Sequence, residues 1–189
     1  MLISIVSFLL ESVFFVLIAA SLLRAWMNWL RINMRVQPGI FIMAITDWLV
    51  KTLRRVMPAT LAKSKVDWGS VLAAFVFAVV YGVLLAALVG VSTGSSGLLE
   101  DVAPSTIVSI LGFAFKTLIG VLLRGLFFMV LAFAVLSWVQ PGSPIYHQLG
   151  RLIDPLITPL RRLIPSIGGV DLSALVLMLI LQVGLMVLG

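Results

Sequence analysis

Four long apolar stretches constrain this chain more than any other feature of its sequence. They cover residues 2–30, 68–91, 107–139 and 172–188. A helix needs roughly 20 apolar residues to cross the hydrocarbon core of a bilayer. Because 62% of the 189 residues are hydrophobic and only 11% are charged, the chain has too little polar surface to cover a water-soluble globule. The sequence therefore predicts an all-α integral membrane protein with four transmembrane helices.

The positive charge is distributed unevenly along the chain. Eleven of the 13 Lys and Arg residues lie in, or next to, the segments that follow the first and the third stretch. The connection between the second and third stretches has no basic residue and carries Glu100 and Asp101. By the positive-inside rule, the two basic segments are expected to be cytoplasmic, and both termini and residues 93–106 to face the other side. Nucleic acid is not an expected partner, because no aromatic residues alternate with these cations.

The two basic segments carry the same motif. Residues 47–58 read DWLVKTLRRVMP and residues 154–165 read DPLITPLRRLIP, with six of twelve positions identical. The apolar stretch before each copy ends in a tryptophan, Trp29 or Trp138. Each copy is therefore the middle of a repeat that consists of a span, an interfacial segment and a second span.

This repetition predicts how the chain is organised. Residues 1–92 form the first hairpin repeat and residues 107–189 the second, joined by a Gly/Ser-rich, non-cytoplasmic loop at 93–106. Because both repeats begin on the same side of the membrane, they are parallel repeats.

Each interfacial segment is expected to be helical and amphipathic. In the first copy, apolar residues recur at helical spacing and the charged residues lie elsewhere on the helix, which is typical of a helix in the membrane interface. These apolar residues are Phe41, Ile45, Trp48, Leu49, Leu53 and Val56. In the second copy, Asp154-Pro155 and Thr158-Pro159 each resemble an N-cap followed by proline. Two short helical turns with a kink are expected there.

The repeated charges form the first candidate site. Its members are Asp47, Arg54, Arg55, Asp154, Arg161 and Arg162. The arginine pairs can act as topogenic charge in contact with lipid phosphate, or they can pair with the two aspartates across the pseudo-twofold axis, because a guanidinium suits bidentate carboxylate binding. A site for an anion or a lipid headgroup is the third interpretation. Asp67 and Asp171 are expected to cap the helices that follow the two copies.

Charges inside the apolar stretches give a second candidate site. Counted outward from the tryptophans, the depth of Glu11 lies between those of Lys116 and Arg124. Because intramembrane charges are costly without a partner, Glu11 is expected to pair with Arg124 or Lys116. The second stretch also carries a small residue at every fourth position, which predicts a helix-packing face. These residues are Ala74, Ala78, Gly82, Ala86 and Gly90.

The double motif, with its Trp-terminated spans, resembles the YggT family of small integral membrane proteins, called YlmG in other bacteria and in plastids. The second copy, PLRRLIPSIGGVDLSALVLMLILQ, follows the family pattern, whereas the first has KTLRRVMPATLAKSKVD in place of a Gly-containing turn. The resemblance implies a bacterial inner-membrane protein linked to osmotic stress tolerance and cell division. It implies no catalytic residue.

Three functions fit these observations. The first is a non-enzymatic organising or assembly factor whose basic segments bind anionic lipid headgroups and another membrane protein or a second copy of the chain. The alternative is a small oligomeric osmolyte or ion pathway. The third is a lipid-modifying enzyme with Asp47 and Asp154 as acids, but the sequence contains none of the common catalytic motifs. No cofactor or metal is expected, because the chain has no cysteine and its only histidine is His147.

Overall fold

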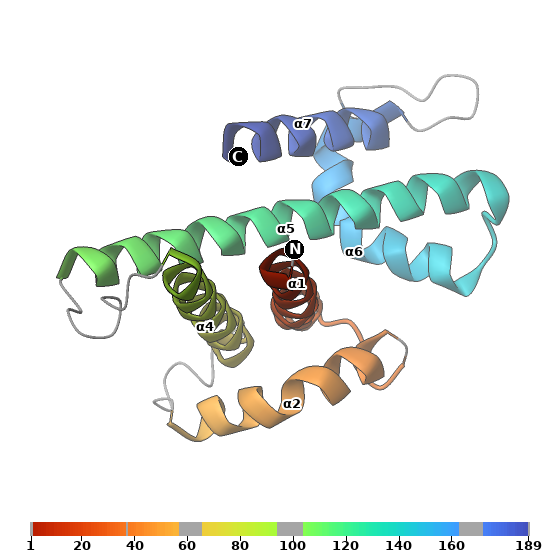
Figure 1. Ribbon diagram of the computed structural model, residues 1–189. Coiled ribbons are helices and arrows are strands. Elements are labelled where there is room, and N and C mark those ends of the chain that lie inside the picture. Colours follow the sequence, from red (N-terminus) through yellow and green to blue (C-terminus); the bar gives the residue numbers. More distant parts are fainter. Residues whose placement is uncertain (1, 37, 57–65, 94–103, 163–171, 189) are drawn as a thin grey trace. The chain divides into compact units, whose positions relative to one another are not determined.

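The computed structural model describes residues 2–36, 38–56, 66–93, 104–162 and 172–188, and the fold given below refers to these ranges. Within them the chain is helical and contains no strand, as the sequence predicted. The six helices are α1 (Leu2–Trp29), α2 (Gly39–Val56), α4 (Trp68–Thr93), α5 (Pro104–Val139), α6 (Pro144–Arg161) and α7 (Leu172–Leu188) (Figure 1).

Three of the six helices are long and apolar enough to cross a membrane. They are α1, α4 and α5, over residues Leu2–Trp29, Trp68–Gly90 and Thr106–Val139. Helix α7 is also apolar but has only 17 residues, which gives about 25 Å of helix against a hydrocarbon thickness of about 30 Å. The predicted fold class is confirmed for the helical fold and for three long apolar helices.

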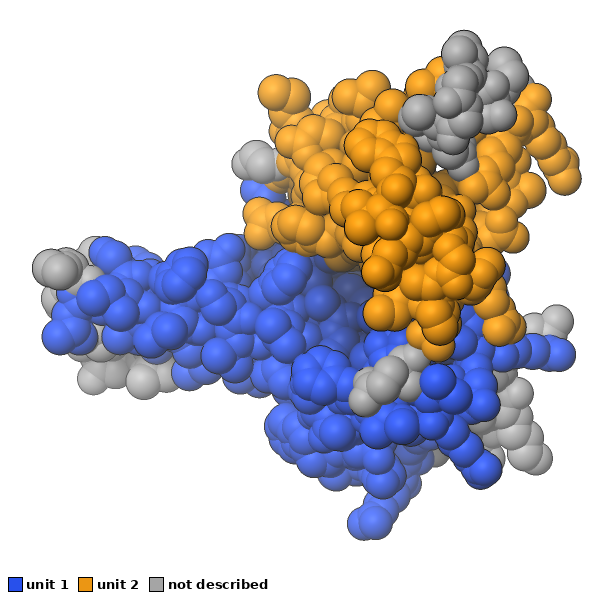
Figure 2. Space-filling model, turned by 90° about the vertical axis from the view of Figure 1, so that its right-hand side faces the viewer, with its two compact units in different colours: residues 1–121 blue, residues 122–189 orange. Residues whose placement is uncertain are grey.

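The chain divides into two compact units, residues 1–121 and 122–189, which Figure 2 shows in different colours. In the first unit, Ile18 of α1 packs with Ala74, Phe77 and Ala78 of α4 and with Ala114 of α5. Ala74 and Ala78 are fully buried, so the small-residue face of α4 packs inside this unit. Small side chains allow such helices to approach closely, which favours van der Waals contact between them.

Helix α2 crosses α1 and α4 instead of running beside them (Figure 1). Its inner face contributes the buried side chains of Ile42, Thr46 and Val50. Phe41 and Trp48 lie on the exposed side, although the Trp48 ring also makes an edge contact with Phe77 of α4. The helix therefore has one face packed on the protein and a second face that presents aromatic side chains.

A tight reversal after α1 leads the chain into α2. Arg31 has φ 55°, the amide of Ile32 donates to the carbonyl of Met27 at 2.9 Å, and the amide of Arg31 donates to Asn28 at 3.1 Å. This is the Schellman pattern, in which a left-handed residue satisfies the last helical carbonyls. The left-handed residue lies two positions beyond Trp29, the last residue of α1, and the reversal there places α2 beside this end of α1.

In the second unit, α6 and α7 pack with the C-terminal half of α5. The core contains Leu126, Val130 and Phe133 of α5, Ile153 and Ile157 of α6, and Ala174, Leu177 and Leu181 of α7. Phe133 also stacks on Tyr146 of α6, with ring centroids 4.8 Å apart and planes inclined by 8°. The apolar face of α6 is thus buried within its own unit.

The expected break of α6 into two capped turns is wrong. One helix runs from Pro144 to Arg161, and its N-cap is Ser143, whose Oγ accepts from the Tyr146 amide at 3.2 Å. Pro155 and Pro159 lie inside this helix, and its axis changes direction along its length (Figure 1). An internal proline removes a hydrogen bond and bends a helix, but burial of Ile153 and Ile157 keeps the flanking turns helical.

Candidate functional site

The described residues hold a buried ion-pair network where α1, α2 and the start of α4 meet. Its first centre is Arg24 of α1, only 5% exposed. Arg24 Nη1 donates to Thr46 Oγ1 at 2.8 Å and to Asp47 Oδ1 at 2.7 Å. The Thr46 hydroxyl in turn donates to the Ile42 carbonyl at 2.8 Å. Arg24 therefore holds α2 against α1. Without these acceptors, burial of its charge in an apolar helix would destabilise the fold.

The second centre is Asp67, the residue before α4. Its Oδ1 accepts from the Ser70 amide at 3.3 Å, which is the arrangement of a helix N-cap, and its Oδ2 accepts from the Ser70 hydroxyl at 2.7 Å. Arg54 Nη2 of α2 lies 2.5 Å from the same Oδ2, and Arg24 Nε lies 3.9 Å from it. Asp67 therefore joins the start of α4 to both α1 and α2.

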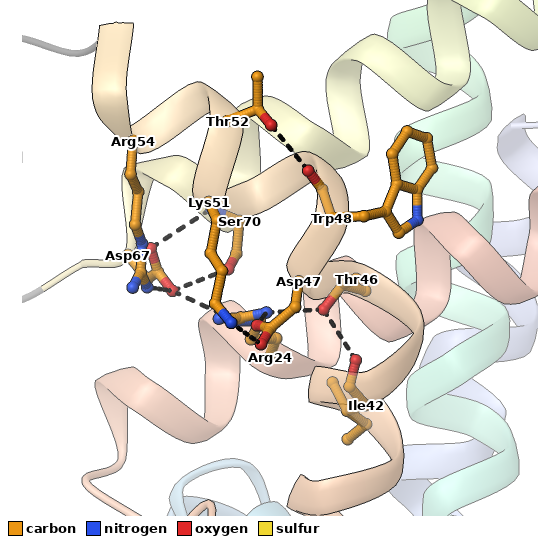
Figure 3. Close-up of polar contacts among 10 residues, drawn as sticks. All are labelled: Arg24, Ile42, Thr46, Asp47, Trp48, Lys51, Thr52, Arg54, Asp67 and Ser70. Carbon is orange, nitrogen blue, oxygen red and sulfur yellow. Dashed lines mark hydrogen bonds and ion pairs between the residues drawn. The ribbon is translucent and has the colours of Figure 1, made fainter.

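Lys51 completes the network at the surface, with its Nζ 2.7 Å from Asp47 Oδ2 (Figure 3). The hydrogen bond from Lys51 lowers the pKa of Asp47 below its usual value of 3.8, partial burial opposes the change, and Arg24 lowers the pKa further. Figure 3 shows the indole of Trp48 pointing away from these charges. Over the part of the chain described, every buried side-chain nitrogen or oxygen has a hydrogen-bond partner.

Gly69, in the first turn of α4, makes room for Arg54. A Cβ at this position would lie 2.7 Å from Arg54 Cγ and 3.3 Å from Asp67 Oδ1. Such contacts are too short, so a larger residue here would displace the arginine. The close approach of α2 and α4 thus depends on a glycine next to the capping aspartate.

In the second unit the aspartate of the motif is more exposed than its counterpart Asp47 in the first. Arg161 Nη1 lies 3.9 Å from Asp154 Oδ1, and their side chains are 45% and 62% exposed. Thr158 donates to Asp154 at 3.1 Å. Asp154 and Arg161 line a cavity of about 270 Å³ on the surface of α6.

The remaining predicted residues are found as follows. Arg55 and Arg162 are exposed, at the ends of α2 and α6. Asp171 lies outside the described residues. Glu11, Lys116 and Arg124 are all exposed on their helices, and the pairing of Glu11 with Arg124 or Lys116 stays a prediction.

The motif charges of the first unit contact residues of the same unit. The contacts of Asp47 are with Arg24 and Lys51, and Arg54 contacts Asp67. Pairing of either aspartate with arginines of the other repeat stays a prediction. Among the described residues, no group of three or more His, Cys, Asp or Glu side chains could hold a metal ion.

Sequence reasoning missed the central member of the network. Arg24 is one of the eleven basic residues that the charge distribution assigns only to topology, and no sequence pattern singles out Thr46 or Ser70. The available signal was an arginine five residues before Trp29, inside an otherwise apolar helix, where a charge requires a named partner.

The long apolar helices, with charged groups gathered at one end of α1, indicate a membrane protein. The chain belongs to the CCB3/YggT family, whose pattern matches residues 3–88 and 108–189. This agrees with the resemblance carried by the double motif.

Several relatives are similar over most of their length. The uncharacterized protein YggT of Escherichia coli (strain K12) is 33% identical over 178 residues, which cover 94% of this chain and 85% of that protein. An uncharacterized protein in the proC 3'region of Vibrio alginolyticus is 34% identical over 185 residues, covering 97% and 92%. An uncharacterized protein of Haemophilus influenzae is 28% identical over 161 residues, covering 85% and 78%. No solved structure matches the chain.

Proposed function

We propose that this chain is a non-enzymatic organising or assembly factor of the bacterial inner membrane that acts through the basic helices α2 and α6. The observation that carries the proposal is the construction of these two helices. Each packs one face on its own unit and carries exposed arginines at its end, Arg54 and Arg55 for α2 and Arg161 and Arg162 for α6. Exposed cations at a membrane surface attract anionic lipid headgroups and acidic surfaces of other membrane proteins.

The proposed architecture has four spans arranged as two parallel hairpin repeats, with α7 as the fourth span. The family pattern supports the repeats because it matches in two segments. The crossing of α2 over α1 and α4 supports an interfacial position for α2 if those two helices span the membrane. A bilayer can thin locally around a short span such as α7.

The proposed orientation places α2 and α6 in the cytoplasm. The support is the distribution of charge, since 11 of the 13 basic residues fall on one side in this arrangement. Both termini and residues 93–106 would then face the other side.

The state of Asp47 supports a non-enzymatic role. Its carboxylate is held by Arg24 and Lys51, and its pKa is lowered, chiefly by the hydrogen bond from Lys51. A general acid needs a pKa near the working pH, so this carboxylate is poorly suited to proton transfer. The link of the family resemblance to osmotic stress and cell division fits a protein that organises other components at the membrane.

Copurification tests this function. The full chain is extracted in mild detergent, and the bound proteins are identified by mass spectrometry. We expect a reproducible membrane-protein partner, and we expect the Arg55→Gln/Arg162→Gln variant to recover about tenfold less of it, because two exposed ion pairs are together worth up to about 2 kcal/mol.

The matched control is Arg31→Gln/Arg35→Gln, which removes the same charge from exposed positions between α1 and α2. Equal recovery of the partner by both double variants would contradict the proposal. A defined homo-oligomer that conducts ions or osmolytes in liposomes would replace it with the solute-pathway function.

A further inference from the structure

The two units differ in the residue that faces the aspartate of the motif. Aligning Trp29 with Trp138 pairs Arg24 with Phe133. Both side chains are buried, at 5% and 4% exposure. In the first unit Arg24 binds Asp47, whose side chain is 29% exposed. In the second unit the phenyl ring of Phe133 stands in place of Arg24, and the side chain of Asp154 is 62% exposed. The second unit therefore leaves open a polar site that the first unit fills.

Two further replacements shape this site. Aligning Asp47 with Asp154 pairs Met43 with Gly150 and Ala44 with Arg151. The glycine removes a long side chain, and a Cβ there would already lie 3.4 Å from Phe133. The arginine adds a cation. The second unit thus gains both space and charge at the positions where the first unit has neither.

The result is the cavity of about 270 Å³ on α6. The stacked rings of Phe133 and Tyr146 contribute an apolar, aromatic wall. This volume is slightly below the range of about 300–1,000 Å³ typical of small-molecule sites, so the cavity suits a small group.

The polar wall carries three groups that can donate hydrogen bonds to an anion. His147, Arg151, Asp154 and Arg161 all line the cavity, and their spacing of four, three and seven residues puts them on one face of α6. Two arginines and one aspartate leave one net positive charge. Asp154 can accept from a hydroxyl or ammonium group next to the anion.

We propose that this cavity, the α6 cavity, binds the phosphate group of a phosphate ester. Arginine binds phosphate through planar, charge-assisted hydrogen bonds, and the net charge of the site matches the single charge of a phosphodiester. The imidazole of His147 supplies one N–H donor even when it is neutral. The aromatic wall suits the apolar part of the same ligand.

The position of the cavity points to a lipid as the source of this group. Phe133 precedes the exposed Trp138 by five residues, which is about 7.5 Å along α5. Tryptophan is enriched at the level of the lipid headgroups. This inference rests on the proposed function, since it names the lipid group that one of the basic helices would hold.

Ligand binding to the full chain in detergent tests the inference. The probes are short-chain phosphatidylglycerol and, as the arm without acyl chains, glycerol phosphate and inorganic phosphate. We expect saturable binding, weakened about tenfold or more by Arg151→Gln and by Arg161→Gln, because a hydrogen bond to a charged group is worth about 1.5–3 kcal/mol. Binding that needs the acyl chains assigns a lipid, and binding of glycerol phosphate or phosphate alone assigns a free phosphate ester or ion; both support the phosphate site.

Arg35→Gln is the control, because Arg35 is an exposed arginine between α1 and α2 and does not line the cavity. We expect it to change the affinity less than about twofold. Gly150→Met fills the cavity without changing charge, and it should weaken binding as strongly as loss of an arginine. Variants that retain the thermal melting of the parent chain exclude misfolding as the cause.

Two results would overturn the inference: no saturable binding of any probe, or equal effects of Arg151→Gln, Arg161→Gln and Arg35→Gln. In either case a partner that copurifies through Arg55 and Arg162 would leave the proposed function standing. If no partner copurifies with the chain but the probes bind the α6 cavity as expected, the result contradicts the proposed function and leaves the phosphate site standing.

Discussion

Arg24 shows how a single charge can fix the arrangement of three helices. A buried guanidinium is costly unless its hydrogen bonds and charge are satisfied. Here Asp47 and Thr46 accept from it and Asp67 lies 3.9 Å away. Because these acceptors come from α2 and from the residue before α4, Arg24 joins all three helices. A change of any one of these side chains should weaken the contact of α2 with α1.

A double-mutant cycle measures this coupling. Arg24→Gln leaves Asp47 and Asp67 short of a cation, although each keeps another, so we expect a loss of about 3 kcal/mol in the free energy of unfolding in detergent. Asp47→Asn removes the other side of the pair, and the two changes should be non-additive by at least about 1 kcal/mol. Arg35→Gln, at an exposed position, should stay within about 0.5 kcal/mol of the parent chain. Strict additivity of the first two changes would show that the pair contributes nothing of its own.

The pH dependence of stability follows from the lowered pKa of Asp47. A carboxyl whose pKa is lower in the folded chain stabilises it above the unfolded pKa, and this stabilisation is lost as the pH falls through the folded pKa. The difference in unfolding free energy between the parent chain and Asp47→Asn should thus be constant from about pH 8 to 5 and shrink below about pH 4. Unfolding titrations at several pH values check this, and a difference that already shrinks between pH 7 and 5 would be inconsistent with the ion pairs.

Individual residues were predictable from sequence only where their role is local. Asp67 was expected to cap a helix because of its place before an apolar stretch, and its carboxylate accepts from the Ser70 amide. The partners of Arg24 lie more than 20 residues away and become neighbours only when α2 folds across α1. No local spacing encodes that contact.

At the level of elements, the apolar helices were predicted well and the interfacial helices less so. The predicted stretch 172–188 coincides with α7, and 107–139 differs from α5 by three residues at its start. A continuous apolar run is a strong signal, because its whole length must leave water. The continuity of α6 through Pro155 and Pro159 was missed, because proline is a local signal that burial of the neighbouring turns overrides.

Gly69 provides a test of how α2 and α4 fit together. Gly69→Ala would bring a Cβ within 2.7 Å of Arg54 Cγ, so we expect a loss of about 1–2 kcal/mol in unfolding free energy despite the higher helix propensity of alanine. Gly112→Ala in α5 is the control, because a Cβ there meets nothing within 4 Å, and it should be neutral or stabilising by up to about 1 kcal/mol. Thermal melting in detergent compares them, and a stabilised Gly69→Ala chain would mean that Arg54 does not need this space.

For the whole molecule, the account depends on the sidedness of its two basic helices. The boundary between the two compact units falls inside α5, between residues 121 and 122, so the units do not coincide with the predicted repeats 1–92 and 107–189. The organisation as two parallel repeats stays a prediction. If the repeats are parallel, α2 and α6 lie at the same membrane surface, and their arginines act on the same leaflet. If they are not, α2 and α6 lie at opposite membrane surfaces, and the proposal that they act together at one surface fails.

Cysteine labelling measures this sidedness directly, because the chain contains no cysteine. An impermeant maleimide is added to intact cells that carry one of four single variants: Thr52→Cys on α2, Gly142→Cys just before α6, Ser95→Cys and Leu188→Cys. The account predicts labelling of the Ser95→Cys and Leu188→Cys variants from outside, and labelling of the other two only after the membrane is opened. Outside labelling of Thr52→Cys or Gly142→Cys, or protection of Leu188→Cys, would contradict it.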